Sequence, residues 1–438
     1  MTRLHRAGSV QAWLAALLLV AACGASPSSE APSTASPTPT VAPTAPPSSV
    51  GPSASPDASN DPAAIYDAIE DQVVAIRELE PVDVARETID AATLKEMNAA
   101  SFDEDNPPEY VAGTERLYKA LALIPADASL RDTYLELLDS QALGFYRPDR
   151  KTLYVVSRSE QIDGADKFTF AHEYDHALQD ANFPGVLDDP EALLDQGDRA
   201  LAVRSVFEGD ATLLMTRWAT VPGNLTPADF QDILALSTDP EMTTVLARTP
   251  AILVEGLNFP YTAGSAFITP IQATGGWAAV DELFADLPQS TEQVLHPDKY
   301  AAGEIPVDVT VPVEQVLARL GDGWSELMQD TFGEFQTRIW LRESGVAATD
   351  AEDAAAGWGG DRLSVLSGPN DRWAVVMRST WDSVADAVSF TDAAQIAIRG
   401  LPHPARIAAP GGTEVTILIA SDQDTLLALD QVLGATGV

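Results

Sequence analysis

The chain has 438 residues and a formal net charge of −39 at pH 7, from 65 acidic and 26 basic side chains. Such acidity repels phosphate groups, which argues against nucleic-acid binding and against electrostatic docking onto anionic lipid. The single cysteine excludes an internal disulfide, so the fold depends on its core and on any bound metal.

The first 22 residues are organised like a bacterial secretory leader. Arg3 and Arg6 precede an apolar run from Val10 to Ala22, and small residues precede Cys23. About 13 apolar residues are too few for a membrane-spanning helix, which needs roughly 20. The pattern resembles a lipobox, which implies cleavage before Cys23, lipid on its sulfur and a mature protein anchored to the bacterial cell membrane on its extracytoplasmic side. An ordinary signal peptide with an incidental cysteine is the alternative.

Residues 23–62 are predicted to form a tether that follows the lipidated Cys23. They consist mainly of Ser, Pro, Ala, Thr and Gly, a composition that cannot bury a core and favours extended chain. The remaining length suits one large domain and one smaller one. We expect a catalytic domain over residues 63–345 and a C-terminal module over 346–438.

The large domain is predicted to be mostly helical with a β-hairpin, in the α+β class. Apolar residues recur at helical spacing from Ala63 to about Ala142. Two β-prone runs follow, Gly144 to Arg147 and Thr152 to Ser157, separated by a turn signal. Two long helices are then predicted, from Phe168 to about Asp180 and from Glu191 to about Trp218.

The first long helix carries an HExxH motif, His172-Glu173-Tyr174-Asp175-His176. Histidines four positions apart on a helix share one face and can chelate one Zn²⁺ ion, while Glu173 can act as general base on a water. The chain has only five histidines, so coincidence is a poor explanation. Catalytic zinc takes a third protein ligand. Glu208 on the second helix is the best candidate, with Asp210 or another carboxylate as the alternative.

The order of hairpin, HExxH helix and Glu208 helix resembles the gluzincin (peptidase MA-like) zinc metallopeptidases, over about residues 140–300. The resemblance implies a zincin-like domain in which Glu208 completes the zinc site, and in which an edge strand, here Leu153 to Ser157, aligns the substrate backbone. Thermolysin-like members carry an Asp four positions after the ligand Glu. That position is Thr212 here, so the residue that orients a zinc ligand is left unassigned.

Peptide hydrolysis also needs a donor for the oxyanion that develops on the attacked carbonyl. His296 is the leading candidate because it follows a capped short helix, although a purely structural histidine is the alternative. Tyr261 and Tyr300 are the other candidates. His403 lies between two prolines and is expected to be structural.

The C-terminal module is predicted to be a small α+β unit. Glycines between Gly357 and Asp361 indicate a turn at its beginning. The periodicity predicts strands over 362–367, 373–380 and 415–419 and helices over 381–399 and 425–433.

These features predict a membrane-anchored extracytoplasmic zinc metallopeptidase, an endopeptidase by default, with one Zn²⁺ and a protein or peptide substrate. No nucleic-acid partner and no particular oligomeric state is predicted. Two other functions stay open. One is a non-catalytic envelope lipoprotein that zinc stabilises and that binds a partner, and the other is a processing peptidase dedicated to one envelope protein.

Overall fold

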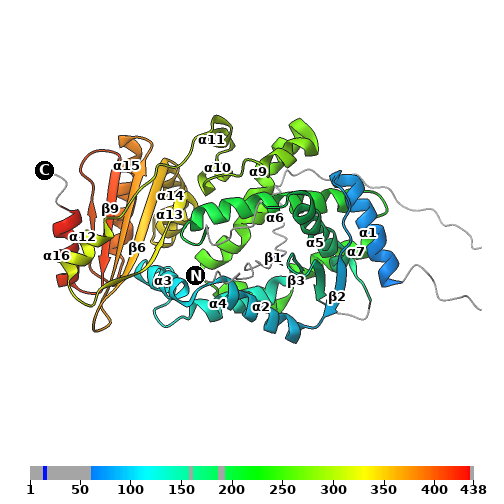
Figure 1. The fold of residues 1–438 in the computed structure, drawn as a ribbon, viewed down its shortest axis with the longest axis horizontal. Helices are drawn as coiled ribbons and strands as arrows, with labels where there is room; N and C mark the ends of the chain where they lie inside the picture. Colours follow the sequence, from blue (N-terminus) through cyan, green and yellow to red (C-terminus); the bar gives the residue numbers. More distant parts are fainter. Residues whose placement is uncertain (1–12, 17–60, 157–160, 186–192, 435–438) are drawn as a thin grey trace, which may run out of the picture.

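The computed structural model describes residues 13–16, 61–156, 161–185 and 193–434. They form an α+β structure in which the helices of the motif region occupy one end and a sheet of C-terminal strands occupies the other (Figure 1). The predicted α+β class is therefore confirmed at this level. Cys23 and all of the tether up to residue 60 lie outside the described residues. Within the described part, no helix combines the length and the apolarity needed to cross a membrane.

The predicted helical stretch near the N-terminus is confirmed, with one strand that the periodicity missed. The strand β2 (Ala85–Ile89) has the sequence ARETI and only partly buried side chains, so it lacks the apolar run that marks a strand in sequence. The helices of this stretch are α1 (Pro62–Arg77), α2 (Ala91–Asp105), α3 (Pro108–Ala120) and α4 (Leu130–Gln141).

The predicted hairpin is present as β3 (Ala142–Arg147) and β4 (Thr152–Val156), which pair antiparallel. A short strand, β1 (Trp13–Ala16), pairs antiparallel with β3, and β2 pairs parallel with β4. The order in the sheet is β1-β3-β4-β2. The expectation that Leu153 to Ser157 forms an edge strand is therefore wrong, because β4 has a neighbour on both sides; Ser157 itself lies outside the described residues.

The HExxH helix is α5 (Gly164–Asn182), which begins earlier than predicted. Asp163 forms a capping box with Asp166, and its side chain accepts hydrogen bonds from the first turn of the helix. The second long helix, α6 (Gly197–Thr220), begins later than predicted. Its first amide, on Gly197, donates to Asp330 from a distant strand, a cap that local sequence does not show.

Helix α9 (Ala251–Leu283) crosses α6 closely enough to require glycine on both helices. A Cβ on Gly264 would lie 2.1 Å from the carbonyl oxygen of Ser205, and one on Gly209 would lie 2.4 Å from the backbone of Gly264. Such distances are shorter than any normal contact. The crossing therefore places α9 directly against the part of α6 that carries Glu208. Two shorter helices, α7 (Pro227–Leu236) and α8 (Pro240–Arg248), connect α6 to α9.

The C-terminal sheet has five strands in the order β5-β6-β7-β9-β8 and helices on both faces. The predicted strands and helices of the module are confirmed, but the unit begins before residue 346, because β5 pairs with β6. In the glycine segment expected to be a turn, Gly357 does lie in a turn, but the residues from Trp358 onward begin β6. The strands are β5 (Ser325–Asp330), β6 (Trp358–Ser367), β7 (Trp373–Trp381), β8 (Ala405–Ala408) and β9 (Glu414–Ala420). The helices are α12 (Val313–Leu320), α13 (Gly333–Glu343), α14 (Ala348–Ala355), α15 (Val384–Arg399) and α16 (Gln423–Leu433).

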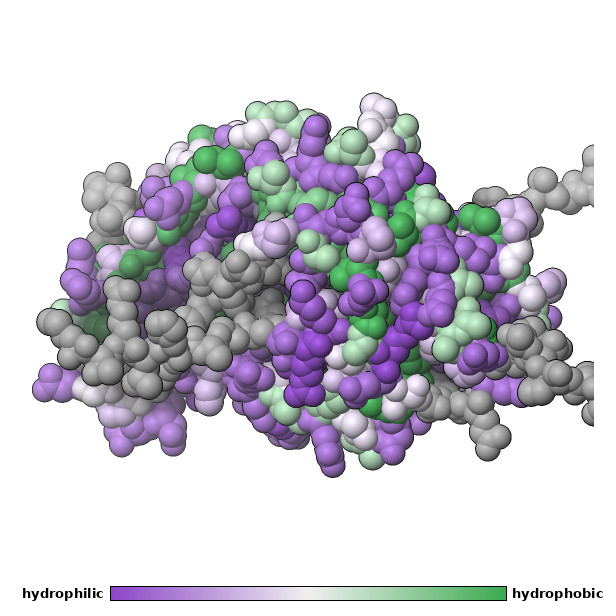
Figure 2. Space-filling model, turned by 45° about the vertical axis from the view of Figure 1, so that its right-hand side comes forward, coloured by the Kyte–Doolittle hydropathy of each residue, from purple (hydrophilic) through white to green (hydrophobic). Residues whose placement is uncertain are grey.

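The described surface is predominantly hydrophilic. Figure 2 shows hydrophobic residues scattered among hydrophilic ones on the face it presents. The exposed large hydrophobic side chains are distributed over separate elements, for example Leu234 on α7, Val388 on α15 and Leu427 on α16. Single exposed hydrophobic residues of this kind are normal on a soluble surface and indicate no particular partner.

Candidate metal centre

Helices α5 and α6 bring three of the predicted ligands together. The Nε2 atoms of His172 and His176 lie 3.1 Å apart, and the Glu208 Oε2 atom lies 3.2 Å from the first and 3.3 Å from the second. His172 and Glu208 are fully buried and His176 is 3% exposed. The two histidines share a face of α5 because they are one turn apart, and Glu208 reaches them because α6 packs against α5.

The triangle of donor atoms has the dimensions of one face of a tetrahedral zinc site. Zinc bonds of about 2.0–2.1 Å to nitrogen and oxygen place neighbouring ligand atoms roughly 3.3 Å apart. Two imidazole nitrogens and a carboxylate oxygen are also ligands that zinc prefers. The second oxygen of Glu208 and the Nδ1 of His172 have no hydrogen-bond partner among the described residues. The nitrogen atoms of His172 and His176 and the carboxylate oxygen of Glu208 thus lie close together inside the fold, and such a buried set of ligand atoms fits a bound cation.

Charge at the site favours a deprotonated Glu208 beside a cation. Burial raises the pKa of Glu208, but the attraction of His176 and the hydrogen bonds from both histidines outweigh burial and lower it well below its usual range. Burial lowers the pKa of His176, whereas Glu208 raises it, to about 10. Burial lowers the pKa of His172. A carboxylate that attracts positive charge this strongly is suited to a metal ion.

Glu173 is fully buried next to the triangle, and neither of its carboxylate oxygens has a hydrogen-bond partner of normal geometry among the residues that the structure describes. Burial raises the pKa of Glu173 to about 8, although His176 and the backbone of Tyr146 favour its charged form. An unpaired buried carboxylate is costly to a fold. Its presence indicates that another group, such as water or substrate, completes its interactions.

Gln179 is the hydrogen-bond partner of His176, one of the candidate metal ligands. From the sequence alone, no residue was assigned to this role. The Oε1 of Gln179 lies 2.9 Å from the Nδ1 of His176, and its Nε2 donates to Asp175, to the Phe207 carbonyl and to Asp210 at 3.0–3.1 Å. Because the amide oxygen only accepts, Nδ1 of His176 carries a proton, and Nε2 is the atom that faces Glu208 and would bind a metal after losing its own proton. Gln179 lies three residues after His176 on the same helix, a spacing that could have revealed it.

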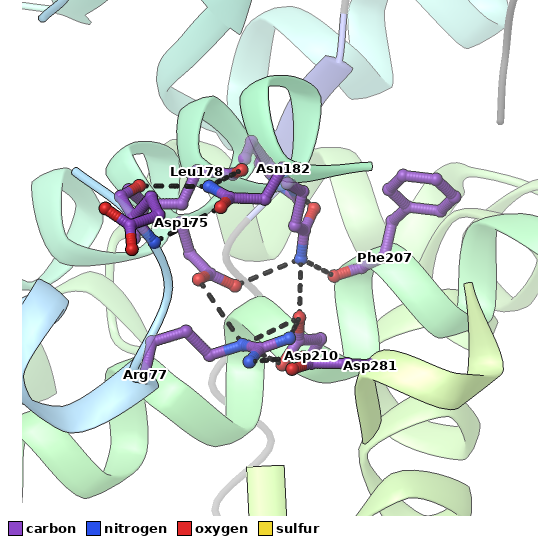
Figure 3. Close-up of polar contacts among 10 residues, drawn as sticks. Arg77, Asp175, Leu178, Asn182, Phe207, Asp210 and Asp281 are labelled. Carbon is purple, nitrogen blue, oxygen red and sulfur yellow. Dashed lines mark hydrogen bonds and ion pairs between the residues drawn. The ribbon is translucent and has the colours of Figure 1, made fainter. Parts of the chain in front are cut away.

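Arg77 from α1 lies beneath this arrangement (Figure 3). Its Nε and Nη2 donate to Asp210 Oδ2 at 3.2 and 3.0 Å, and its Nη1 pairs with Asp281 at 2.7 Å. Its charge also lies 3.9 Å from Asp175. The alternative of Asp210 as a metal ligand is not supported, because its carboxylate faces Arg77 and Gln179. Nothing in the local sequence of Arg77 predicts this role.

Tyr261 is the candidate oxyanion donor that the structure brings to the site. Its ring is buried and stacks on His172 at a centroid distance of 5.9 Å. His296 instead lies between α10 (Thr291–Leu295) and α11 (Pro297–Ala302), and its Nε2 pairs with Glu334 at 3.0 Å. Tyr300 donates its hydroxyl to the Asp286 carbonyl. Neither of these two contacts the triangle in the described part of the chain, and His403 packs on Trp373.

A second acidic cluster among the described residues already holds a cation. Glu292, Glu304 and Asp382 have oxygens close enough to share a metal ion. Lys299 Nζ lies 2.6 Å from Glu292, 3.0 Å from Glu304 and 2.5 Å from Asp382. The ammonium group therefore occupies the position that a metal would take, which leaves His172, His176 and Glu208 as the better metal centre.

Comparison with known proteins adds information only about the C-terminal end. A family described as a domain of unknown function (DUF8575) matches residues 319–430. The match includes β5 to β9 and supports a C-terminal unit that begins near residue 319. It covers less than half of the chain and none of the residues at the metal centre. No curated protein and no solved structure matches the chain.

Proposed function

We propose that this chain is a zinc-dependent metallopeptidase of the gluzincin type, anchored by lipid on Cys23 outside the cytoplasm. The observation that carries the proposal is the buried triangle of His172, His176 and Glu208 with edges of 3.1–3.3 Å, next to the unpaired carboxylate of Glu173. A ligand set of two histidines and one glutamate is typical of catalytic zinc in peptidases.

Each residue of the site has a distinct role in this proposal. A zinc ion held by the three ligands would polarise the substrate carbonyl and lower the pKa of a water molecule. Glu173 would accept a proton from that water and deliver it to the nitrogen of the leaving amine. Tyr261, stacked on His172, is the better placed of the predicted donors to the developing oxyanion. Gln179 would hold His176 in the tautomer that binds metal.

The position of the strand β3 favours a peptide as the substrate. The strand lies against α5 at Gly144, where a Cβ would lie 3.0 Å from the Cγ2 of Thr169 and 3.6 Å from the Cγ of Glu173. Among the described strands, β1 alone pairs with its outer side, and β1 belongs to the leader that we expect to be removed. Without β1, the backbone groups of β3 would face outward next to Glu173 and could pair with an extended peptide. We therefore assign to β3 the substrate-aligning role first expected of β4.

The composition of the metal cluster favours catalysis over a purely structural metal. Structural zinc sites are usually closed by four protein ligands. In the described part of the chain, the cluster contains three residues, and no fourth His, Cys, Asp or Glu joins them. A structural site also has no use for an unpaired glutamate beside the metal. A narrow processing peptidase has the same site, so substrate range separates it from a general endopeptidase.

The test is zinc content together with peptide-library cleavage by the full-length chain in detergent and by the chain begun at Cys23. Wild type and Glu173→Gln are compared in both forms. We expect near-stoichiometric zinc in every sample and cleavage only with Glu173 present, because the substitution removes the base and no ligand. Zinc without cleavage in any sample would favour the binding lipoprotein, and absence of zinc would refute the site.

A further inference from the structure

A pocket of about 320 Å³ lies between α2, α3 and α4 on one side and α6 and α9 on the other, and Arg204, one helical turn before Glu208, is among its lining residues. Its walls are largely apolar and aromatic. They include Phe102, Tyr110, Tyr118 and Tyr134, together with leucines from α4 and α9. A pocket of this size accommodates an amino-acid side chain or the end of a peptide.

Arg204 brings a positive charge into this pocket. It lies on α6 one helical turn before Glu208, so both side chains lie on the same face of the helix. Its guanidinium lies next to the Tyr134 hydroxyl and near Tyr261. Burial lowers the pKa of Arg204, but Tyr134 and Glu208 raise it by more, so the group stays charged. In contrast to Arg77, it forms no contact ion pair with a carboxylate of the described residues, and the attraction of Glu208 acts on it from one helical turn away.

The pairing of β1 with β3 gives the direction in which an extended peptide passes the site. β1 runs antiparallel to β3, with Leu14 opposite Phe145, Ala15 opposite Gly144 and Ala16 opposite Ala142. A peptide in this direction meets Glu173 at Gly144. Its following residues then leave at Ala142, the residue at which α4 ends. β1 itself packs against α4, whose Tyr134 and Leu138 line the pocket. This path would place the pocket on the C-terminal side of the bond that Glu173 would attack.

We propose that this pocket binds the residue that follows the cleaved bond, and that Arg204 selects a carboxylate there. The carboxylate could come from an acidic side chain or from the free C-terminus of the peptide. The inference rests on the proposed function. A guanidinium forms two parallel hydrogen bonds with a carboxylate, and the aromatic walls bind the apolar part of the residue while they limit access of water. Asp105 also lines the pocket and accepts a hydrogen bond from the Ser101 hydroxyl.

The experiment uses pairs of peptides that differ in one carboxylate. One pair has Glu or Gln after the cleaved bond, and the other ends there in a free or an amidated C-terminus. The chain begun at Cys23 is compared with its Arg204→Gln and Arg204→Lys variants. Arg199→Gln is the matched control, because Arg199 is also on α6 but lines a different pocket. We expect wild type to prefer the carboxylate of at least one pair by about 10-fold or more in kcat/KM, mainly through KM. Arg204→Gln should lose the preference and Arg204→Lys should keep part of it, with zinc content unchanged.

Direct binding separates failure of this inference from failure of the proposed function. In the Glu173→Gln background, fluorescence anisotropy would show tighter binding of the carboxylate peptides that depends on Arg204. The subsite would be refuted if wild type cleaves or binds both peptides of each pair equally well. It would also be refuted if the Arg204→Gln variant keeps the preference for the carboxylate. Either result would leave the peptidase proposal intact. Arg204-dependent binding without cleavage by wild type would overturn the peptidase and retain the pocket as an anion-selective peptide site.

Discussion

The Oε1 atom of Gln179 lies 2.9 Å from the Nδ1 atom of His176, on the side of the imidazole that faces away from Glu208. We therefore expect Gln179→Ala to weaken zinc binding by about 10–100-fold, because the ring loses the acceptor that fixes its tautomer and orientation. Zinc affinity is measured by competition with a chelator. Asn182→Ala on the same helix is the control, since Asn182 bonds to Glu80 and Leu178 instead. Unchanged zinc affinity in Gln179→Ala would refute the role of this contact.

Arg77→Met should destabilise the protein by about 3–5 kcal/mol, because it leaves the buried carboxylates of Asp210 and Asp175 without their cation. The free energy of unfolding is measured by denaturant titration. Arg86→Met is the comparison. Arg86 pairs with Asp67 and Glu70 near the surface, so its loss should cost at most about 1 kcal/mol. Equal effects of the two substitutions would contradict the importance of burial in the Arg77 network.

Gly264→Ala should destabilise the protein by roughly 2 kcal/mol or more, because its Cβ would collide with the Ser205 carbonyl at the crossing of α6 and α9. Gly256→Ala on the same helix meets no atom within 4 Å and should be neutral or stabilising by up to about 1 kcal/mol. Thermal unfolding of both variants tests this difference. A neutral Gly264→Ala would show that the two helices can move apart without cost.

Asp198 should make the free energy of unfolding fall as the pH rises from about 4 to 7. Burial raises the pKa of Asp198 to about 7, although Thr291 donates two hydrogen bonds to it, and the unfolded value is near 3.8. The folded state therefore binds more protons between these values. The stability gained by protonation is complete below the unfolded pKa and is lost as the pH passes the folded pKa. Asp198→Asn should flatten the pH dependence of the unfolding free energy by about 1 kcal/mol or more. Parallel pH profiles for wild type and Asp198→Asn would disprove the assignment.

The metal triangle was predictable because its chemistry is local. His172 and His176 are one turn apart on one helix, and Glu208 follows on the next long helix. The hairpin and the strands of the C-terminal sheet were predictable for the same reason, since apolar alternation marks each of them. The second neighbour of β4, the strand β2, was not predictable. β2 has little apolar signal, and its parallel pairing with β4 depends on the path of the chain between them.

The residues around the metal triangle also differ in whether the local sequence could predict them. Gln179 could have been found from its spacing to His176. Arg77 could not, because it reaches Asp210 only after α1 has packed against α5 and α6. For a similar reason, the sequence could not show which oxyanion candidate lies nearest to the triangle. The crossing of α6 and α9 brings Tyr261 to His172, and this crossing depends on Gly209 and Gly264 rather than on any feature of Tyr261 itself.

The position of Arg77 on α1 sets the shortest fragment that could work as an independent unit. α1 is the first described helix after the tether, and Asp61 caps its N-terminus. A fragment trimmed to the hairpin and the HExxH helix would keep every metal ligand but would lose the only charge that neutralises Asp210 among its described ion pairs. A proteolytic cut upstream of Asp61 would therefore leave α1 and its ion pairs intact, whereas a cut just after Arg77 would separate its guanidinium group from Asp210.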